Sequence, residues 1–196
     1  MGAVSGGPWI DDWLGLETGF GGGYRLGWDA EHYWGLETRF TFASVPVYDS
    51  ARAVRAQWDA DTAAGLAEND PQRRRFDAGR DADVFQWDVS FLYYPWGDAA
   101  WRPYLAVGLG VGQIEAIDRL SRYLDETMFA LPVAAGLKYR CDDRLALRIE
   151  AADIVDFSRN DEFRNLHNMT YTAGVEIRFG GTRRAYWPWN PGRHYW

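Results

Sequence analysis

The fold is decided by the stretch WLGLETGFGGGYRLGW, residues 13–28. Its even positions, from Leu14 to Trp28, are mostly large and apolar, whereas its odd positions are Gly, Glu or Arg between the two tryptophans. Successive side chains of a β-strand point to opposite faces of a sheet. The alternation therefore predicts a strand with one apolar face and one face of small or charged residues.

Six further segments repeat this alternation, at residues 33–43, 85–93, 105–112, 129–139, 145–150 and 169–179. The short links between strands are residues 29–32, 97–101 and 141–143, and the long links are residues 44–83, 115–127 and 158–167. Short and long links thus alternate, as in outer-membrane barrels with short periplasmic turns and longer extracellular loops. We predict an all-β, antiparallel up-and-down barrel of about eight strands, of which seven can be read directly.

The longest link contains a segment with helical spacing. Ala-rich residues 50–68 place Val54, Trp58 and Leu66 where a short helix would group them on one face. A link of this length without structure of its own would be unusual, so we predict a partly helical extracellular loop at residues 44–83.

Alternation alone does not say which face is inside, because a soluble lipocalin-like barrel would also alternate. The apolar face carries roughly thirty large side chains, and an eight-stranded barrel has an interior only just wide enough for side chains to fill. We therefore expect the apolar face to point outward into lipid, as in a transmembrane barrel.

The other face is rich in Gly and Ala and carries balanced charges, which would have to be paired in a narrow lumen. The predicted lumen ion-pair network consists of Glu17, Arg25, Glu37, Arg39, Asp88, Lys138, Arg148, Glu150, Glu176 and Arg178. Within it, we expect Arg39 and Arg148 to bridge to Glu37, Glu150 or Glu176. The alternative is a solvated exterior whose charges balance by chance.

Large aromatic residues recur near the short-link ends of the predicted strands. The predicted girdle consists of Trp28, Trp34, Tyr93, Trp96, Trp101, Tyr139 and Phe179. Trp and Tyr favour the headgroup level of a bilayer, where one side of the ring is apolar and the other is wet.

Composition excludes several classes of function. The net charge of −7 gives no domain-wide basic surface for nucleic acid. The single cysteine, Cys141, allows no internal disulfide, and the three histidines have no metal-ligand spacing, so we expect neither a metal nor a cofactor. No apolar stretch approaches the length of a membrane-spanning helix. The first residues also lack the pattern of a signal peptide, although an outer-membrane protein needs one, so we expect a processed, trimmed or mis-started form.

Three stretches resemble the small OmpA-like outer-membrane barrel family. These are GGGYRLGWDAEHYWGLETRFTF at residues 21–42, RPYLAVGLG at residues 102–110 and AGVEIRF at residues 173–179. The likeness covers most of residues 13–180 and implies the outer membrane of a Gram-negative-type bacterium. It also implies an even number of strands. Residues 1–12 would then supply an irregular first strand, or that strand is missing from this sequence.

The expected role is structural or interaction-based, with a closed lumen, lipid around the barrel and specificity in the extracellular loops, and without catalysis. One alternative is a hydrolase acting on lipid A, with His167, Ser158 and Glu162 as its candidate residues. Another is a narrow pore.

The tail after the barrel, residues 181–196, contains Trp-Pro-Trp-Asn-Pro. Its segment 183–196 is expected to bind a periplasmic partner or a second copy, or else to cover the periplasmic opening or remain disordered.

Overall fold

The computed structural model describes residues 2–5, 8–10, 14–30, 32–77, 79–97, 99–157 and 166–179. The strands are β1 (Gly2–Ser5), β2 (Pro8–Ile10), β3 (Leu14–Leu16), β4 (Gly19–Asp29), β5 (Trp34–Asp49), β6 (Asp81–Tyr93), β7 (Trp101–Ile117), β8 (Tyr123–Arg140), β9 (Leu145–Phe157) and β10 (Leu166–Ile177). The helices are α1 (Ala51–Ala63) and the single 3-10 turn η1 (Pro71–Arg74). Ser158, Glu162 and the tail segment 183–196 lie outside the described residues.

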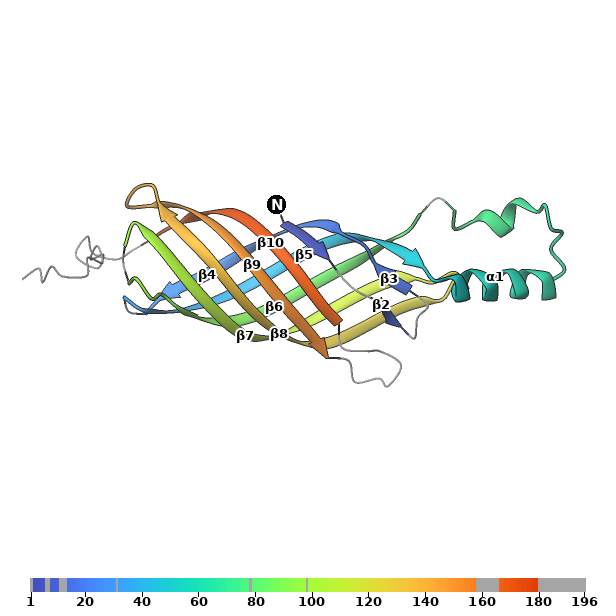
Figure 1. Ribbon diagram of the computed structural model, residues 1–196, viewed down its shortest axis with the longest axis horizontal. Coiled ribbons are helices and arrows are strands. Elements are labelled where there is room, and N and C mark those ends of the chain that lie inside the picture. Colours follow the sequence, from blue (N-terminus) through green and yellow to red (C-terminus); the bar gives the residue numbers. More distant parts are fainter. Residues whose placement is uncertain are drawn as a thin grey trace, which may run out of the picture.

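Antiparallel pairing runs from β4 through β10 in chain order, and β1 pairs with both β10 and β4. The hydrogen-bonded order thus returns to its first strand and forms a barrel (Figure 1). Among the described helices, none is long and apolar enough to cross a membrane. The strand that could not be read from the alternation is β1, in the segment where an irregular first strand was one of the two alternatives.

The first predicted strand is interrupted by a β-bulge. Leu16 pairs with Val47 and Phe20 pairs with Ser44, so four steps on one strand match three on β5. The extra residue lies at Glu17–Thr18 and reverses which face the preceding side chains point to. Expecting residues 13–28 to alternate without a break was therefore wrong.

This bulge corrects two side-chain assignments. Leu14 and Leu16 were placed on the outward face with Phe20, but they are buried at 3% and 2% exposure. Glu17 was placed in the lumen network, but it is exposed at the bulge, where its backbone N–H donates to Pro46 O. Glu17 does not belong to the lumen.

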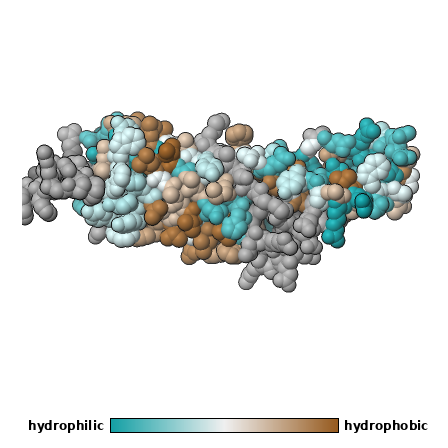
Figure 2. Space-filling model, in the orientation of Figure 1, coloured by the Kyte–Doolittle hydropathy of each residue, from teal (hydrophilic) through white to brown (hydrophobic). Residues whose placement is uncertain are grey.

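Beyond the bulge, the outward face is apolar along all the long strands. Phe20, Leu105 and Ile149 are 72%, 57% and 59% exposed. Apolar surface gathers over the barrel strands, whereas polar surface predominates over the segment that projects from them (Figure 2). An exposed apolar surface that follows the barrel wall has the character of a lipid-facing belt.

Inside the barrel, the end nearer the long links is filled by apolar side chains. We call this set the apolar layer; it consists of Leu16, Ala43, Val45, Ala82, Ile114, Ala116 and Met128. Val45 and Ile114 are 0% and 1% exposed, so this end of the barrel is packed as a core.

The link between β5 and β6 forms a projecting segment, here called the arm, residues 50–80 (Figure 1). The predicted helix within residues 50–68 is present as α1, and Ser50 caps it by accepting from the Ala53 N–H. At the barrel rim, Asp49 accepts from Arg80, and it accepts from Arg119 Nε at 2.6 Å. Arg119 Nη1 also donates to Gln57 of α1 at 2.8 Å, so these contacts tie the arm to the barrel.

Candidate functional site

The centre of the lumen is organised around Glu150, which projects inward from β9 and has a side chain that is 2% exposed. Its carboxylate accepts from Arg25 Nη1 and Nη2, both at 2.8 Å, and from Arg39 Nη1 at 3.1 Å. It also accepts from Arg148 Nη2 at 2.6 Å and from the Tyr104 hydroxyl at 2.6 Å. One carboxylate thus joins side chains from β4, β5, β7 and β9.

Two more carboxylates complete the charge balance around these arginines. Arg148 donates twice to Glu37, with Nη2 at 3.0 Å from Oε1, and Arg25 Nη1 lies 3.3 Å from the same oxygen. Arg39 Nε donates to Asp88 Oδ2 at 2.7 Å. Three guanidinium groups therefore face three carboxylates, which is the arrangement that makes buried charge tolerable.

We call this set the charged layer; it consists of Arg25, Glu37, Arg39, Asp88, Tyr104, Arg148 and Glu150. Small residues make room for it. A Cβ built on Gly136 would lie 2.2 Å from the Tyr104 hydroxyl oxygen, so the tyrosine ring lies directly over that glycine. The Gly-rich inward face of the sequence is thus the space into which long side chains extend.

A second polar set lies toward the short links. We call it the mouth layer; it consists of Asp29, Tyr94, Arg102, Lys138, Glu176 and Arg178. Asp29 Oδ2 accepts from Arg102 at 2.5 Å and from Arg178 at 2.9 Å. Lys138 Nζ lies 2.7 Å from Glu176 Oε2. Arg102 is stacked on the Tyr94 ring, 3.4 Å from its centroid.

The structure places nine of the ten residues of the predicted network in these two layers, all except Glu17. Arg148 pairs with Glu37 and Glu150, and Arg39 pairs with Asp88 and Glu150. The prediction did not include Asp29, Tyr94, Arg102 or Tyr104, although the alternation of β7 gives Arg102 and Tyr104 the same parity as inward Ala106.

Between the charged and apolar layers lies a buried carboxyl group that pairs with no cation among the described residues. Asp156 is 4% exposed and accepts from Asn168 Nδ2 at 2.6 Å. Within the part of the chain that the structure describes, its other oxygen has no hydrogen-bond partner, and neither has the side-chain nitrogen of Gln86. Asp156 therefore differs from Glu150, whose oxygens are surrounded by donors.

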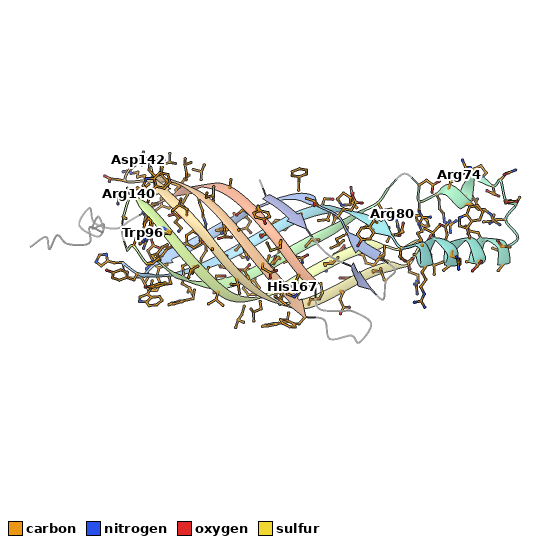
Figure 3. The ribbon with its side chains drawn as sticks, in the orientation of Figure 1. Arg74, Arg80, Trp96, Arg140, Asp142 and His167 are labelled. Atoms are coloured by element: carbon orange, nitrogen blue, oxygen red, sulfur yellow. The ribbon has the colours of Figure 1, made fainter. Side chains whose placement is uncertain are left out.

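The seven aromatic residues of the predicted girdle are exposed, from 38% for Tyr93 and Tyr139 to 89% for Phe179. Trp34 and Tyr93 have ring centroids 4.7 Å apart, and Trp101 and Tyr139 have centroids 4.5 Å apart. Trp96 lies at the short-link end of the barrel, as do Arg140 and Asp142, whereas His167 lies toward the other end (Figure 3).

His167 Nδ1 lies 3.3 Å from Asp153 Oδ2, and both side chains are exposed, at 64% and 41%. The other two candidate residues of the hydrolase alternative, Ser158 and Glu162, lie outside the described residues. The described residues contain no group of acidic, His and Cys side chains arranged to hold a metal ion. Cys141 is exposed.

A comparison with protein families matches the outer membrane protein beta-barrel domain over residues 3–179. Among solved structures, the chain is similar to Neisserial surface protein A (NspA), with 14% identity, a TM-score of 0.56 and coverage of 91% of this chain and 94% of that one. It is also similar to Ail, the attachment invasion locus protein of Yersinia pestis, in complex with the heparin analogue sucrose octasulfate. That match has 14% identity, a TM-score of 0.45 and coverage of 91% and 97% of the two chains.

No curated protein sequence matches the chain. At 14% identity the likeness to NspA bears on the fold alone, whereas the family match spans nearly the whole barrel. The apolar face therefore points into lipid, and the lipocalin-like alternative is wrong. The chain belongs to the outer membrane protein beta-barrel domain family and is located in the outer membrane.

Proposed function

We propose that this protein is a non-catalytic outer-membrane barrel with a closed lumen, whose arm provides a contact surface outside the cell. The observation that carries the proposal is the charged layer, in which Glu150 accepts hydrogen bonds from four side chains on different strands. These side chains cross the lumen, so an open channel would require them to move aside.

The closure is supported at three levels of the barrel. At the short links, the mouth layer pairs Asp29 with Arg102 and Arg178. The charged layer follows toward the arm, and the apolar layer fills the end nearest the arm. An eight-stranded barrel leaves little interior space once side chains fill it. Outer-membrane lipid is the partner that the outward apolar belt fits.

An interaction role is supported by how the arm is held. Within it, Gln57 is fully buried and donates to the Asp61 carboxylate at 3.0 Å and to Arg73 O at 2.8 Å. Arg73 also lies over the Trp58 ring, 4.9 Å from its centroid. A connecting loop that needed only to join two strands would not require this internal packing, whereas an ordered surface reduces the entropy lost on binding.

Liposome swelling tests the closed lumen. Vesicles with the folded protein in their bilayer are diluted into iso-osmotic arabinose, and protein-free vesicles and vesicles containing a general porin serve as controls. We expect swelling at the rate of protein-free vesicles. Swelling at a rate close to that of the porin vesicles would show an open pore and would contradict the proposal.

A hydrolase acting on outer-membrane lipid is the second candidate. It is favoured by the His167–Asp153 pair, because a carboxylate that orients a histidine is part of many hydrolase sites. It is tested by incubating the folded protein with lipid A and measuring released fatty acid by mass spectrometry. Release that is lost in His167→Ala would replace the non-catalytic proposal with this one.

A further inference from the structure

Strands β7 and β8 continue past the lipid-facing belt at the end of the barrel nearer the arm (Figure 1). A transmembrane β-strand needs about 9–11 residues, whereas β7 has 17 and β8 has 18. Along β7 the outward side chains are apolar from Trp101 to Val111 and become polar at Gln113. Along β8 the same change follows Phe129. The parts of both strands beyond these points therefore lie outside the bilayer.

Three carboxylates lie directly opposite one another on the outward face of this extension. Asp83 of β6 is opposite Glu115 of β7, and Glu115 is opposite Asp125 of β8. Neighbouring strands are about 4.8 Å apart, so this row spans only about 10 Å. Like charges directly opposite each other destabilise a sheet. The row thus has a cost in the barrel alone, which cations supplied from outside would offset.

The hydrogen bonds that the row accepts from other side chains come from neutral groups. Gln113 Nε2 donates to Glu115 Oε1 at 3.2 Å and to Asp125 Oδ1 at 3.0 Å. The Tyr123 hydroxyl donates to the other oxygen of Glu115. These contacts fix the positions of the carboxylates without neutralising them.

The arginines next to the row in sequence are engaged with other groups. Arg80 pairs with Asp49 and donates to the backbone oxygen of Ile117 at 2.6 Å. Arg122 Nε lies 2.7 Å from Asp118 Oδ2. Within the described part of the chain, none of the three row carboxylates takes part in an ion pair.

Two exposed apolar side chains lie beside the acidic row. Ile117 and Tyr123 are opposite each other on β7 and β8, two residues beyond Glu115 and Asp125, and they are 48% and 62% exposed. Because they lie past the belt, lipid does not cover them. Exposed apolar groups rimmed by charge are typical of a protein contact surface. We call this set the outer patch; it consists of Asp83, Gln113, Glu115, Ile117, Tyr123 and Asp125.

We propose that the outer patch binds a basic polypeptide segment that carries an apolar or aromatic residue among its lysines or arginines. The patch lies on the barrel wall rather than on the arm, so this goes beyond the proposed function and does not depend on a closed lumen. Nucleic acid, an anionic polysaccharide or an anionic lipid would meet charge of its own sign. The described residues include no group arranged to hold a metal ion, and the apolar pair favours a polypeptide over a simple polyamine.

Peptide binding to the folded protein in phosphatidylcholine nanodiscs tests the proposal. The probe is a short fluorescent peptide of lysine and serine around one central tryptophan, and its anisotropy is measured at low salt. A second peptide has serine in place of the tryptophan, and empty nanodiscs give the background. We expect saturable binding of the first peptide, weaker binding of the second, and a loss of affinity as salt is added.

The charge of the row is tested by combining Glu115→Gln with Asp125→Asn. The matched control combines Asp59→Asn with Glu68→Gln, which removes the same charge from exposed positions on the arm. Surface ion pairs contribute up to about 1 kcal/mol each, so we expect the first variant to bind about fivefold more weakly. The control should stay within about twofold of the parent.

The apolar pair is tested by Tyr123→Ser. We expect about a threefold loss of affinity for the tryptophan peptide and no change for the serine peptide. An equal loss for both peptides, equal losses in the two charge variants, or no binding above empty nanodiscs would overturn the proposal. Displacement of the peptide by Mg²⁺, where K⁺ at the same ionic strength has no effect, would also overturn it and assign the row to a metal ion.

Discussion

In the half of the lumen nearer the short links, inward side chains are Arg, Lys, Glu, Asp and Tyr, and each described carboxylate there meets a cation. In the half nearer the arm, the apolar layer consists of Leu, Val, Ile, Met and Ala side chains, with buried Asp156 and Asn168 between it and the charged layer. Buried side chains fill both halves, but they are of different kinds. Ion pairs fix the positions of strands that are far apart in sequence, whereas apolar packing depends on filled volume.

The largest effect is expected from removing the charge at the centre of the charged layer. Glu150→Gln leaves Arg25, Arg39 and Arg148 buried with one fewer carboxylate to share. Breaking a buried ion pair from one side costs about 3–5 kcal/mol. We expect a loss of this size in the free energy of unfolding, measured by urea titration of the folded barrel in lipid vesicles.

The matched control for that variant is Glu17→Gln, which changes the same residue type at the exposed bulge. Its free energy of unfolding should stay within about 0.5 kcal/mol of the parent. Equal losses in the two variants would show that the lumen charges contribute nothing specific to stability.

The apolar half should respond to lost volume. Ile114→Ala removes a side chain that is 1% exposed, and such truncations cost about 2–5 kcal/mol. Ile117→Ala, on the same strand but 48% exposed and outward, should cost clearly less. Urea titration of both variants measures the difference, and a larger loss for Ile117→Ala would reverse the inward and outward assignment of β7.

Asp156 can be compared directly with Glu150, because it is also a buried carboxyl group in the lumen but no described cation meets it. Asp156→Asn keeps the shape and a polar contact to Asn168 while removing a charge that is costly to bury. We expect the free energy of unfolding at neutral pH to be unchanged or higher. A loss as large as that of Glu150→Gln would show that Asp156 has a partner of opposite charge.

Sequence alternation predicted most of the wall and most of the lumen charges, because the side-chain period of a strand is the same in every strand of the barrel. It failed where that period is broken. The bulge at Glu17–Thr18 inserts one residue between Leu16 and Gly19, and nothing in the alternation marks it. Leu14, Leu16 and Glu17 were therefore assigned to the wrong faces.

Three members of the mouth layer, Asp29, Tyr94 and Arg102, were missed for a different reason. Asp29 was read as part of a turn, and the alternation on the later strand was read only from Leu105 onward, so neither Asp29 nor Arg102 was assigned to a face. Cross-lumen partners depend on barrel closure and tilt, which a single strand's pattern does not contain. The pairing of Arg102 with Asp29 could be seen only once the strands were placed around the barrel.

The smallest effect is expected in the arm. The hydrogen bond from Arg75 holds the pKa of the Asp61 carboxyl below its ordinary range. A lowered folded-state pKa contributes stability that is present above the ordinary aspartate pKa of about 4 and is lost as the pH falls below it. Amide NMR signals of residues 51–63 should therefore shift on acidification below about pH 4, and Asp61→Asn should remove this dependence. An unchanged acid response in that variant would assign it to another group.

The central claim, a lumen closed by ion pairs, is tested most directly by single-channel recording of the unmodified protein in planar bilayers. We expect no steady conductance above that of the bare bilayer, because the charged layer crosses the lumen and the apolar layer fills the end above it. Large, long-lived open channels from folded protein would contradict the account.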